Sequence, residues 1–325
     1  MTQFNYIVTE KDKELSIKEL LHRKFNFSSR LMTKIKQQDL ITLNGEKVRG
    51  WIIPQAGDKI TVTLPEESCN YPAEDIPIEV VYEDDSLLVI NKQPGIVVHP
   101  TKGKPTGTVA NGLMKKIQDE KKPYKIRFVN RLDMNTSGLL IVAKNGFSQE
   151  YLIRQMRNNT IEKRYIAMVD GIVKNDAGTI NAPIGRPDPN EVERWLLPVE
   201  KGGYDSVTHY QVLRRFDSGY TLVELKLETG RTHQIRVHMA SIGHPVTGDH
   251  LYNNGDPFLY RQIHGDYRRI EGYGEESTSP YINRQALHAY RLTFRHPMTE
   301  EIITLEAPLP KDINDLIHSV SLCTP

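Results

Sequence analysis

The chain has 325 residues, of which 38% are apolar, a net charge of +1 and only two cysteines, Cys69 and Cys323. This length exceeds one typical domain and fits two unequal ones, with enough apolar residues for a sizeable core. No apolar run approaches a membrane span, the first residues lack a signal-peptide pattern, and neither cysteine has metal-binding or redox spacing. These features exclude a membrane-spanning or disulfide-rich secreted protein and predict a cytoplasmic one.

The charges are distributed unevenly along the chain. Residues 11–50 contain ten Lys or Arg against five Asp or Glu, and residues 101–165 contain fourteen against five. Subtracting these from the totals of 42 and 41 leaves 18 basic and 31 acidic residues elsewhere. Solvated charged faces are common, but two separate basic stretches favour contact with nucleic-acid phosphates.

Residues 13–64 have the pattern of a small αβ module. Apolar residues at i, i+3, i+4 and i+8 predict a helix from Ile17 to Phe25. Ser28 or Ser29 can cap a second helix, because a serine hydroxyl accepts a hydrogen bond from a free backbone N–H of the first turn. The polar side of this second helix carries three cations, Arg30, Lys34 and Lys36.

A hairpin and a closing strand complete this module. Residues 41–48 alternate around Asn-Gly, the strongest short signal for a hairpin turn, and residues 59–64 alternate again. Residues 65–75 are polar and include Pro65 and Pro72, which predicts a linker. A second domain is expected over residues 76–325.

The second domain is predicted to consist mainly of short strands. An apolar run at 139–143, bounded by turn residues, predicts a buried strand. Other strands and helices are predicted from alternating or helical spacing at 78–92, 109–117, 148–157, 162–171, 221–227, 232–243, 285–294 and 302–307, followed by a short C-terminal helix. Residues 253–284 are polar and aperiodic, which predicts a long surface loop. His99, before a proline, is interpreted as an edge residue.

Asp133 precedes the 139–143 strand in the polar stretch Asn130–Gly138, two residues after Arg131. A carboxylate held at the end of a rigid strand suits covalent or acid–base chemistry. An Asp in such a turn equally often caps backbone N–H groups. The stretch alone leaves both interpretations open.

A helix expected after Thr232 carries Arg236 beside the apolar stripe of Ile235, Met239 and Ile242. A buried arginine requires an acidic partner. Histidines cluster in this region, but none has the spacing and flanking Glu of a zinc helix, so no metal is predicted. The histidines are His233, His238, His244 and His250.

Three separated strings together resemble the motifs of RluA-type RNA pseudouridine synthases. They are VNRLDMNTSGLLIVAK around Asp133, KRYIAMVDG around Tyr165 and TGRTHQIRVHMASIGHPVTGD around Arg236. Residues 13–64 resemble the S4-type RNA-binding domain. The chain departs from the family at Asn130, where His is usual, and at Asn91-Lys92-Gln93-Pro94-Gly95, where the family usually has Asn-Lys-Pro-x-Gly.

The resemblance implies an α+β fold with a central, mostly antiparallel sheet, flanking helices and loops, and a cleft across the sheet. It implies that Asp133 is the nucleophile, that Arg236 pairs with it, and that Tyr165 stacks on the uracil of a flipped-out uridine. Arg131 then fills the vacated place in the base stack, and Arg30, Lys34 and Lys36 bind RNA.

The expected partner is RNA, with large-subunit ribosomal RNA favoured over transfer RNA. No cofactor or metal is expected. The protein is expected to be a monomer. The alternative is a non-catalytic RNA-binding or ribosome-assembly factor with the same fold.

Overall fold

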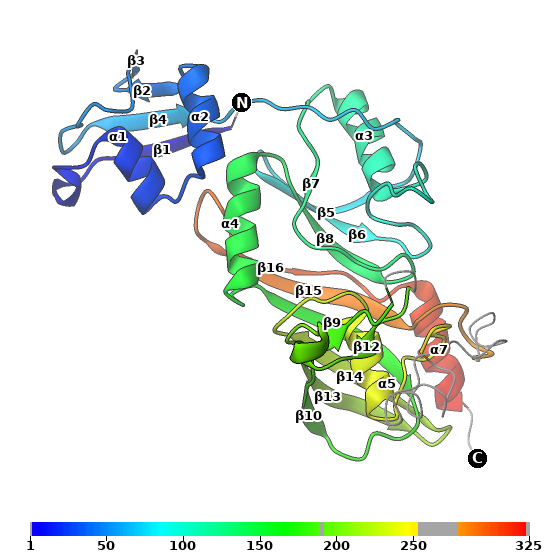
Figure 1. Cartoon of the computed structure of the whole chain (residues 1–325). Helices are drawn as coiled ribbons and strands as arrows, with labels where there is room; N and C mark the ends of the chain where they lie inside the picture. Colours follow the sequence, from blue (N-terminus) through cyan, green and yellow to red (C-terminus); the bar gives the residue numbers. More distant parts are fainter. Residues whose placement is uncertain (1, 189–191, 253–278, 323–325) are drawn as a thin grey trace.

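The computed structural model describes residues 2–188, 192–252 and 279–322, which form a small N-terminal region and a larger one (Figure 1). Most of the predicted 253–284 loop lies outside the described residues, and 279–284 contain neither helix nor strand. No helix in the described ranges has the length and apolar character needed to cross a bilayer.

The N-terminal region (residues 2–64) is a four-stranded antiparallel sheet with helices against it, in the strand order β1-β4-β2-β3. The strands are β1 (Gln3–Ile7), β2 (Ile41–Leu43), β3 (Glu46–Lys47) and β4 (Lys59–Thr63). The helices are η1 (Glu10–Asp12), α1 (Ile17–Glu19), the π-helical turn η2 (Leu20–Lys24) and α2 (Ser29–Gln37). The predicted helices, hairpin and closing strand are confirmed, whereas β1 was not foreseen and precedes residue 13.

The cap of α2 is Ser28, whose hydroxyl accepts a hydrogen bond from the N–H of Leu31 at 3.2 Å. Residues 65–75 contain no helix or strand. Within this segment, Cys69 and Tyr71 pack against the core of the large region. The segment therefore follows the surface of the large region rather than spanning open solvent.

The large region is built on a sheet in the order β10-β13-β14-β9-β15-β8-β6-β5, with β16 paired to β15 and β7 to β8. Its strands are β5 (Glu79–Glu83), β6 (Leu87–Lys92), β7 (Arg127–Phe128), β8 (Ser137–Ala143), β9 (Glu162–Asp170), β10 (Ala177–Asn181), β13 (Val207–Phe216), β14 (Tyr220–Leu227), β15 (Leu287–Arg295) and β16 (Ile302–Glu306). A short separate hairpin pairs β11 (Ile184–Gly185) with β12 (Trp195–Leu196). The predicted α+β fold with a mostly antiparallel sheet is confirmed.

Helices cover this sheet from both sides and explain its continuous apolar strands. On one face, helix α3 (Val109–Glu120) packs against alternate residues of β6 and β8, among them Leu88 and Leu140. On the other face, helix α4 (Gly146–Arg157) packs against the intervening residues, among them Val89 and Ile141. All seven residues of β8 are buried as a result. Burial on both faces removes the alternation of polar and apolar residues that marks a one-sided strand.

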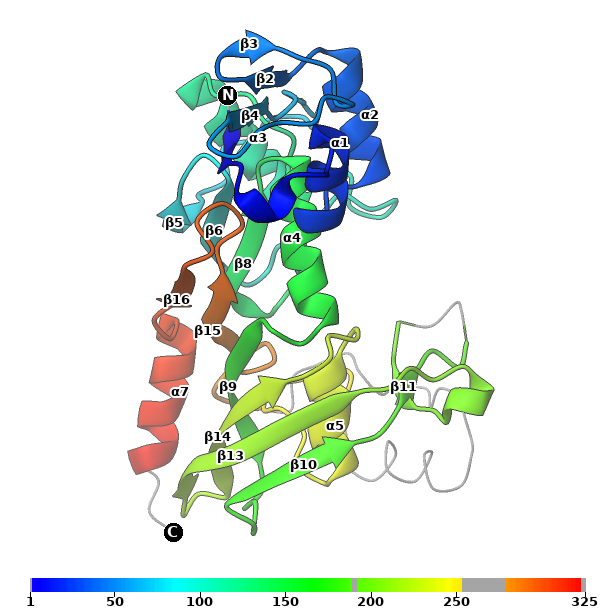
Figure 2. The same ribbon diagram turned by 90° about the vertical axis from the view of Figure 1, so that its left-hand side faces the viewer.

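The other half of the sheet packs against α5 (Gln234–Ser241) and α7 (Lys311–Leu322), which flank strand β9 in Figure 2. The expected cap and stripe of α5 were wrong in detail. The N-cap is His233, with a left-handed φ of 58°, not Thr232. Ile242 follows the helix and is 38% exposed. Residues 234–240 are all buried, so helical spacing carried no information about which face is inside.

Strands β8 and β15 join the two halves of the sheet through a short parallel pairing of Ser137 with His288 and Gly138 with Ala289. Gly138 has a φ of +112°, and a Cβ at this position would lie 2.2 Å from the carbonyl oxygen of Ala289. Only glycine allows this approach. The junction lies directly after the Asp133 turn.

We expect Gly138→Ala to reduce the free energy of unfolding by about 2–5 kcal/mol, from the left-handed backbone and the contact with the Ala289 carbonyl. Urea denaturation measures this change. Gly146→Ala is the matched control, because its Cβ meets nothing within 4 Å at the start of α4, and it should cost nothing. Equal stability of the two variants would contradict this account of the junction.

Candidate active site

Asp133 lies in the turn that leads into β8. The N–H of Thr136 donates to its backbone oxygen at 3.1 Å, which closes the turn. The side chain is 26% exposed, so one side of the carboxylate faces outward. The strand thus presents a partly buried carboxylate at its edge.

Arg236 of α5 reaches this carboxylate from the other half of the sheet. Its Nη1 donates to Asp133 Oδ2 at 3.1 Å. Its Nε and Nη2 donate to the two oxygens of Asp249 at 2.6 and 2.8 Å. Burial alone would lower the pKa of Arg236, but the charge of Asp249 and then that of Asp133 outweigh this effect and raise it. Arg236 is therefore a permanent cation shared by two carboxylates.

Tyr165 lies on β9, between Ala289 of β15 and Leu225 of β14 in the register of the sheet. It lines the same small hollow of about 60 Å³ as Asp133 and Arg236. Burial and the charge of Asp133 both raise the pKa of the Tyr165 phenol. Tyr165 is therefore a neutral phenol at neutral pH, and its ring forms part of the floor of the hollow.

His233 also faces Asp133, whereas in the sequence it stood out only as one of four clustered histidines. Its Nε2 is 3.9 Å from Asp133 Oδ2, and its Nδ1 is 2.8 Å from the hydroxyl of Tyr252. Burial, followed by the charge of Arg236, lowers the pKa of His233 to about 4. The imidazole is therefore neutral, and the positive charge beside Asp133 comes from Arg236. The sequence signal that could have placed His233 beside Asp133 was its position three residues, about one helical turn, before Arg236.

Two further cations hold the Asp133 turn, and neither was singled out from the sequence. Lys92 at the end of β6 is fully buried, and its ammonium donates to the carbonyls of Gln93, Ile96 and Met134 at 2.8, 3.0 and 2.9 Å. Burial lowers the pKa of Lys92 to about 7, while Asp133 acts in the opposite direction. The turn is therefore tied to the 93–96 segment.

Arg284 holds the turn from the C-terminal side. Its Nη1 donates to the carbonyl of Asn135 at 2.9 Å, and its Nε and Nη2 donate to Asp312 of α7 at 2.6 and 2.8 Å. Asp249, Lys92 and Arg284 lie far apart in the sequence. Lys92 and Asp249 stand in segments compared with the family motifs, which was the available signal, but no spacing or periodicity linked any of the three to Asp133.

Asn130, the departure from the family motif, has a structural role. Its side-chain amide donates to the carbonyl of Leu139 at 3.3 Å, and its oxygen accepts from the N–H of Ile141 at 2.8 Å. These bonds fix the start of the 130–138 stretch against β8. Among the described residues, Asn130 forms no hydrogen bond with Asp133, and the Asp133–Arg236 pair is intact beside it.

The expected RNA-binding cations lie in different places. Arg131 is exposed, with its Nη2 3.4 Å from the hydroxyl of Thr232, and it lines the Asp133 hollow. Arg30 and Lys34 line a larger hollow that Arg131 also lines. Lys36 instead lines a hollow on another side of the N-terminal region. The structure therefore brings Arg30 and Lys34 together but not Lys36.

No group of three or more His, Cys, Asp or Glu side chains in the described part of the chain is arranged to hold a metal ion. The site offers a carboxylate, a fixed cation, a neutral phenol and a neutral imidazole. This set can supply a nucleophile and hydrogen bonds to a planar polar ring without a redox step.

The comparisons identify the class of protein to which this site belongs. A sequence model described as "RNA pseudouridylate synthase" matches residues 86–241. The fold is similar to that of Human RNA Pseudouridylate Synthase Domain Containing 4, with a TM-score of 0.57 and 24% identity over 76% of this chain and 94% of that one.

Two curated relatives are similar over most of their length. Uncharacterized RNA pseudouridine synthase YlyB of Bacillus subtilis (strain 168) is 40% identical over 98% of this chain and 99% of its own. Ribosomal large subunit pseudouridine synthase D of Neisseria meningitidis serogroup B (strain ATCC BAA-335 / MC58) is 40% identical over 82% of this chain and 68% of its own. The chain belongs to the RNA pseudouridine synthase family, and the RluA-type resemblance of its large region is confirmed.

A double-mutant cycle on Arg236 and Asp249 tests whether the buried pair holds the site together. Arg236→Leu and Asp249→Asn should each reduce the free energy of unfolding by about 3–5 kcal/mol, because the first leaves the buried Asp249 unpaired and the second leaves the buried Arg236 with only its single hydrogen bond to Asp133. The double variant should lose less than the sum. Urea denaturation of the four proteins measures the coupling, and additivity within about 0.5 kcal/mol would show that the two side chains do not interact.

Proposed function

We propose that the protein converts uridines of large-subunit ribosomal RNA to pseudouridine, with Asp133 as the nucleophile. The observation that supports this most directly is the meeting of Asp133, Arg236 and Tyr165 at one hollow. The choice of ribosomal RNA is supported by relatives that are named ribosomal large subunit pseudouridine synthase D.

The reaction is an isomerisation, so its atoms balance without a co-reactant. The bond between N1 of uracil and C1′ of ribose breaks, the base turns, and a bond between C5 and C1′ forms. The hydrogen on C5 is released as a proton, and N1 takes up a proton. Asp133 can add either to C1′ or to C6 of the base, and its exposed side is open to both.

Arg236 holds Asp133 in place in this proposal, through the hydrogen bond from its Nη1 to Asp133 Oδ2 at 3.1 Å. Because Asp249 already occupies two donors of Arg236, the guanidinium cannot rotate away when Asp133 forms a bond to substrate. Arg236 is therefore a positioning residue for the nucleophile.

Tyr165 provides a flat ring for the uracil to stack on. Because its pKa is raised, Tyr165 stays a protonated phenol at neutral pH and has no phenolate to act as a base, so stacking and hydrogen-bond donation are its proposed roles. The C5 proton must then leave through another group or through water.

The target nucleotide must leave the base stack to reach Asp133, at a cost of a few kcal/mol. We propose that Arg131 takes its place, because this exposed arginine lies at the rim of the hollow. Charged contacts elsewhere on the RNA offset the cost of flipping.

Those contacts are assigned to the first part of the chain. In this proposal residues 13–64 form an S4-like RNA-binding domain, 65–75 a linker and 76–325 the catalytic domain. Arg30, Lys34 and Lys36 contact RNA, and the protein acts as a monomer in the cytoplasm. Supporting observations are the capped basic helix α2 and its sheet.

We expect Asp133→Asn to abolish isomerisation and to leave RNA affinity within a few-fold of wild type. The variant should fold, because Arg236 retains Asp249. Tritium release from RNA labelled at C5 of uridine reports activity, and a filter-binding assay reports affinity. Wild-type protein that binds RNA but releases no tritium would favour the alternative, a non-catalytic assembly factor.

The RNA target is tested by mapping carbodiimide-reactive uridines in total RNA from cells with and without the gene. Loss of one or more modified sites in large-subunit ribosomal RNA is expected. Sites lost only from transfer RNA would contradict the proposed substrate while leaving the reaction unchanged. Reintroduced wild-type protein, but not Asp133→Asn, should restore the sites.

A further inference from the structure

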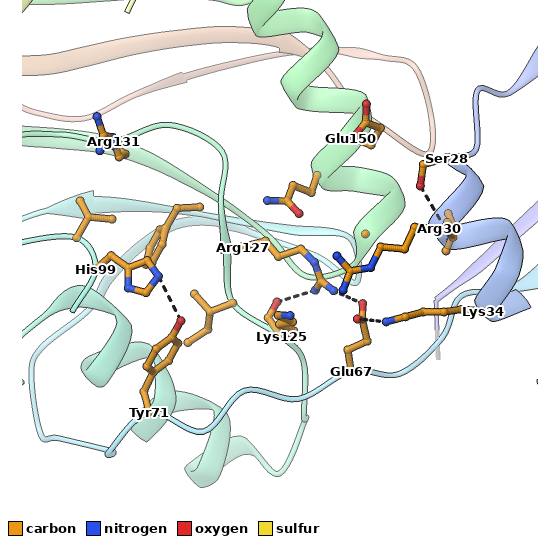
Figure 3. A pocket seen from close by; sticks show the side chains of 16 residues that line it. Ser28, Arg30, Lys34, Glu67, Tyr71, His99, Lys125, Arg127, Arg131 and Glu150 are labelled. Atoms are coloured by element: carbon orange, nitrogen blue, oxygen red, sulfur yellow. Dashed lines mark hydrogen bonds and ion pairs between the residues drawn. The ribbon is translucent and has the colours of Figure 1, made fainter. Parts of the chain in front are cut away.

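A groove of about 550 Å³ lies between the N-terminal region and the large region (Figure 3). One wall comes from helix α2, another from the start of α4, and the rest from the 67–71, 98–99 and 125–131 segments. This basic groove is about nine times the volume of the Asp133 hollow, from 550 and 60 Å³. It is within the ~300–1,000 Å³ range of small-molecule sites and can hold a nucleotide.

The groove has an excess of three positive charges. Its five cations, Arg30, Lys34, Lys125, Arg127 and Arg131, face two carboxylates, Glu67 and Glu150. Glu67 pairs with both Lys34 and Arg127. In the described part of the chain, Arg30 and Lys125 have no acidic side chain within ion-pair distance. Two cations are therefore available to phosphates without breaking an existing ion pair.

Three rings, those of Tyr71, His99 and Phe128, line the groove beside these cations. The ring of His99 meets the ring of Tyr71 edge-on, with centroids 5.5 Å apart, and His99 Nε2 is 3.4 Å from the Tyr71 hydroxyl. Phe128 lies 6.1 Å from His99. His99 is exposed, and these neighbours fix its ring. Rings beside cations are the pattern that binds unpaired nucleotides, because a base stacks while its phosphate pairs.

Arg131 connects the groove to the Asp133 hollow, because it lines both. An RNA strand that places a uridine at Asp133 can therefore continue past Arg131 into the groove. Figure 3 shows Arg131, His99 and Tyr71 on one side of the groove and Arg30 and Lys34 on the other.

We infer that the basic groove binds an unpaired nucleotide next to the target uridine, with its base against His99 and the strand's phosphates on Arg30 and Lys125. This inference rests on the proposed function, since it takes the uridine at Asp133 as its starting point. It narrows the substrate to RNA in which the target and a neighbour are both unpaired. A base inside a duplex has no free face for His99.

The test uses the full-length protein and a fluorescent oligouridylate of about a dozen nucleotides. His99→Ala should weaken binding about five- to a hundredfold, the range for loss of one base–aromatic stack. Arg30→Ala should weaken binding and reduce the slope of log K against log salt by about 1. The matched controls are His318→Ala and Lys174→Ala, which alter exposed residues outside both the groove and the N-terminal region and should bind like wild type.

Ultraviolet cross-linking of the wild-type complex gives a second readout that needs no variant. Cross-linked uridine is expected on a peptide containing Tyr71, His99 or Phe128. Wild-type affinity in His99→Ala together with cross-links confined to other peptides would overturn the inference. Binding of poly-glutamate instead of oligouridylate would also overturn the inference, provided that Arg30→Ala lowers the affinity for poly-glutamate. The groove would then be a site for an acidic peptide.

Tritium release in the same proteins separates this inference from the proposed function. Binding that depends on His99 in a protein without activity supports the groove and contradicts the proposed reaction. Full activity together with unchanged RNA affinity in His99→Ala supports the proposed reaction and overturns the inference that the groove binds a nucleotide.

Discussion

The buried guanidinium of Arg236 is the constraint on which the site depends. Its side chain is 6% exposed, and a charge at such depth is tolerated only with closely placed opposite charges. Asp249 supplies one bidentate partner and Asp133 a second, weaker one at 3.1 Å. The same cation that pairs with the buried Asp249 thereby fixes the position of Asp133. The stability of the buried pair and the position of Asp133 therefore depend on one interaction, and the Asp133 carboxylate is held in place although it is 26% exposed.

The proposed reaction and the proposed RNA contacts are assigned to two hollows of different volume. The Asp133 hollow has a volume of about 60 Å³ and is bounded by rigid strands and the buried helix α5. The groove beyond Arg131 is far larger, about 550 Å³, and is lined by five cations and two carboxylates. A small hollow can align one ring with a carboxylate, whereas a large charged groove contributes affinity along the strand.

Much of this arrangement was predictable from the sequence, and the rest was missed for identifiable reasons. Strand β8 and the hairpin of the N-terminal region follow from apolar runs and an Asn-Gly turn, and the motif resemblance placed Asp133, Tyr165 and Arg236 in one site. Lys92 and Asp249 act on Asp133 across the fold, and no periodicity links residues that meet only through tertiary packing. Helical spacing did contain one unused signal. Arg30 and Lys34 are four residues apart and share a face, whereas Lys36 is two residues further and cannot.

Helix α4 shows why the basic groove is a fixed feature. Its Leu152 packs in the core of the large sheet, while its Phe147 enters the core of the N-terminal region, with ring centroids 4.8 Å from Phe27 and 5.7 Å from Phe4. Residues 146, 149 and 150 of the same helix line the groove. One rigid element therefore joins both regions and forms the wall between them (Figure 1). A groove held in place by two hydrophobic cores does not have to be assembled when RNA arrives, so less binding free energy is spent on ordering the protein.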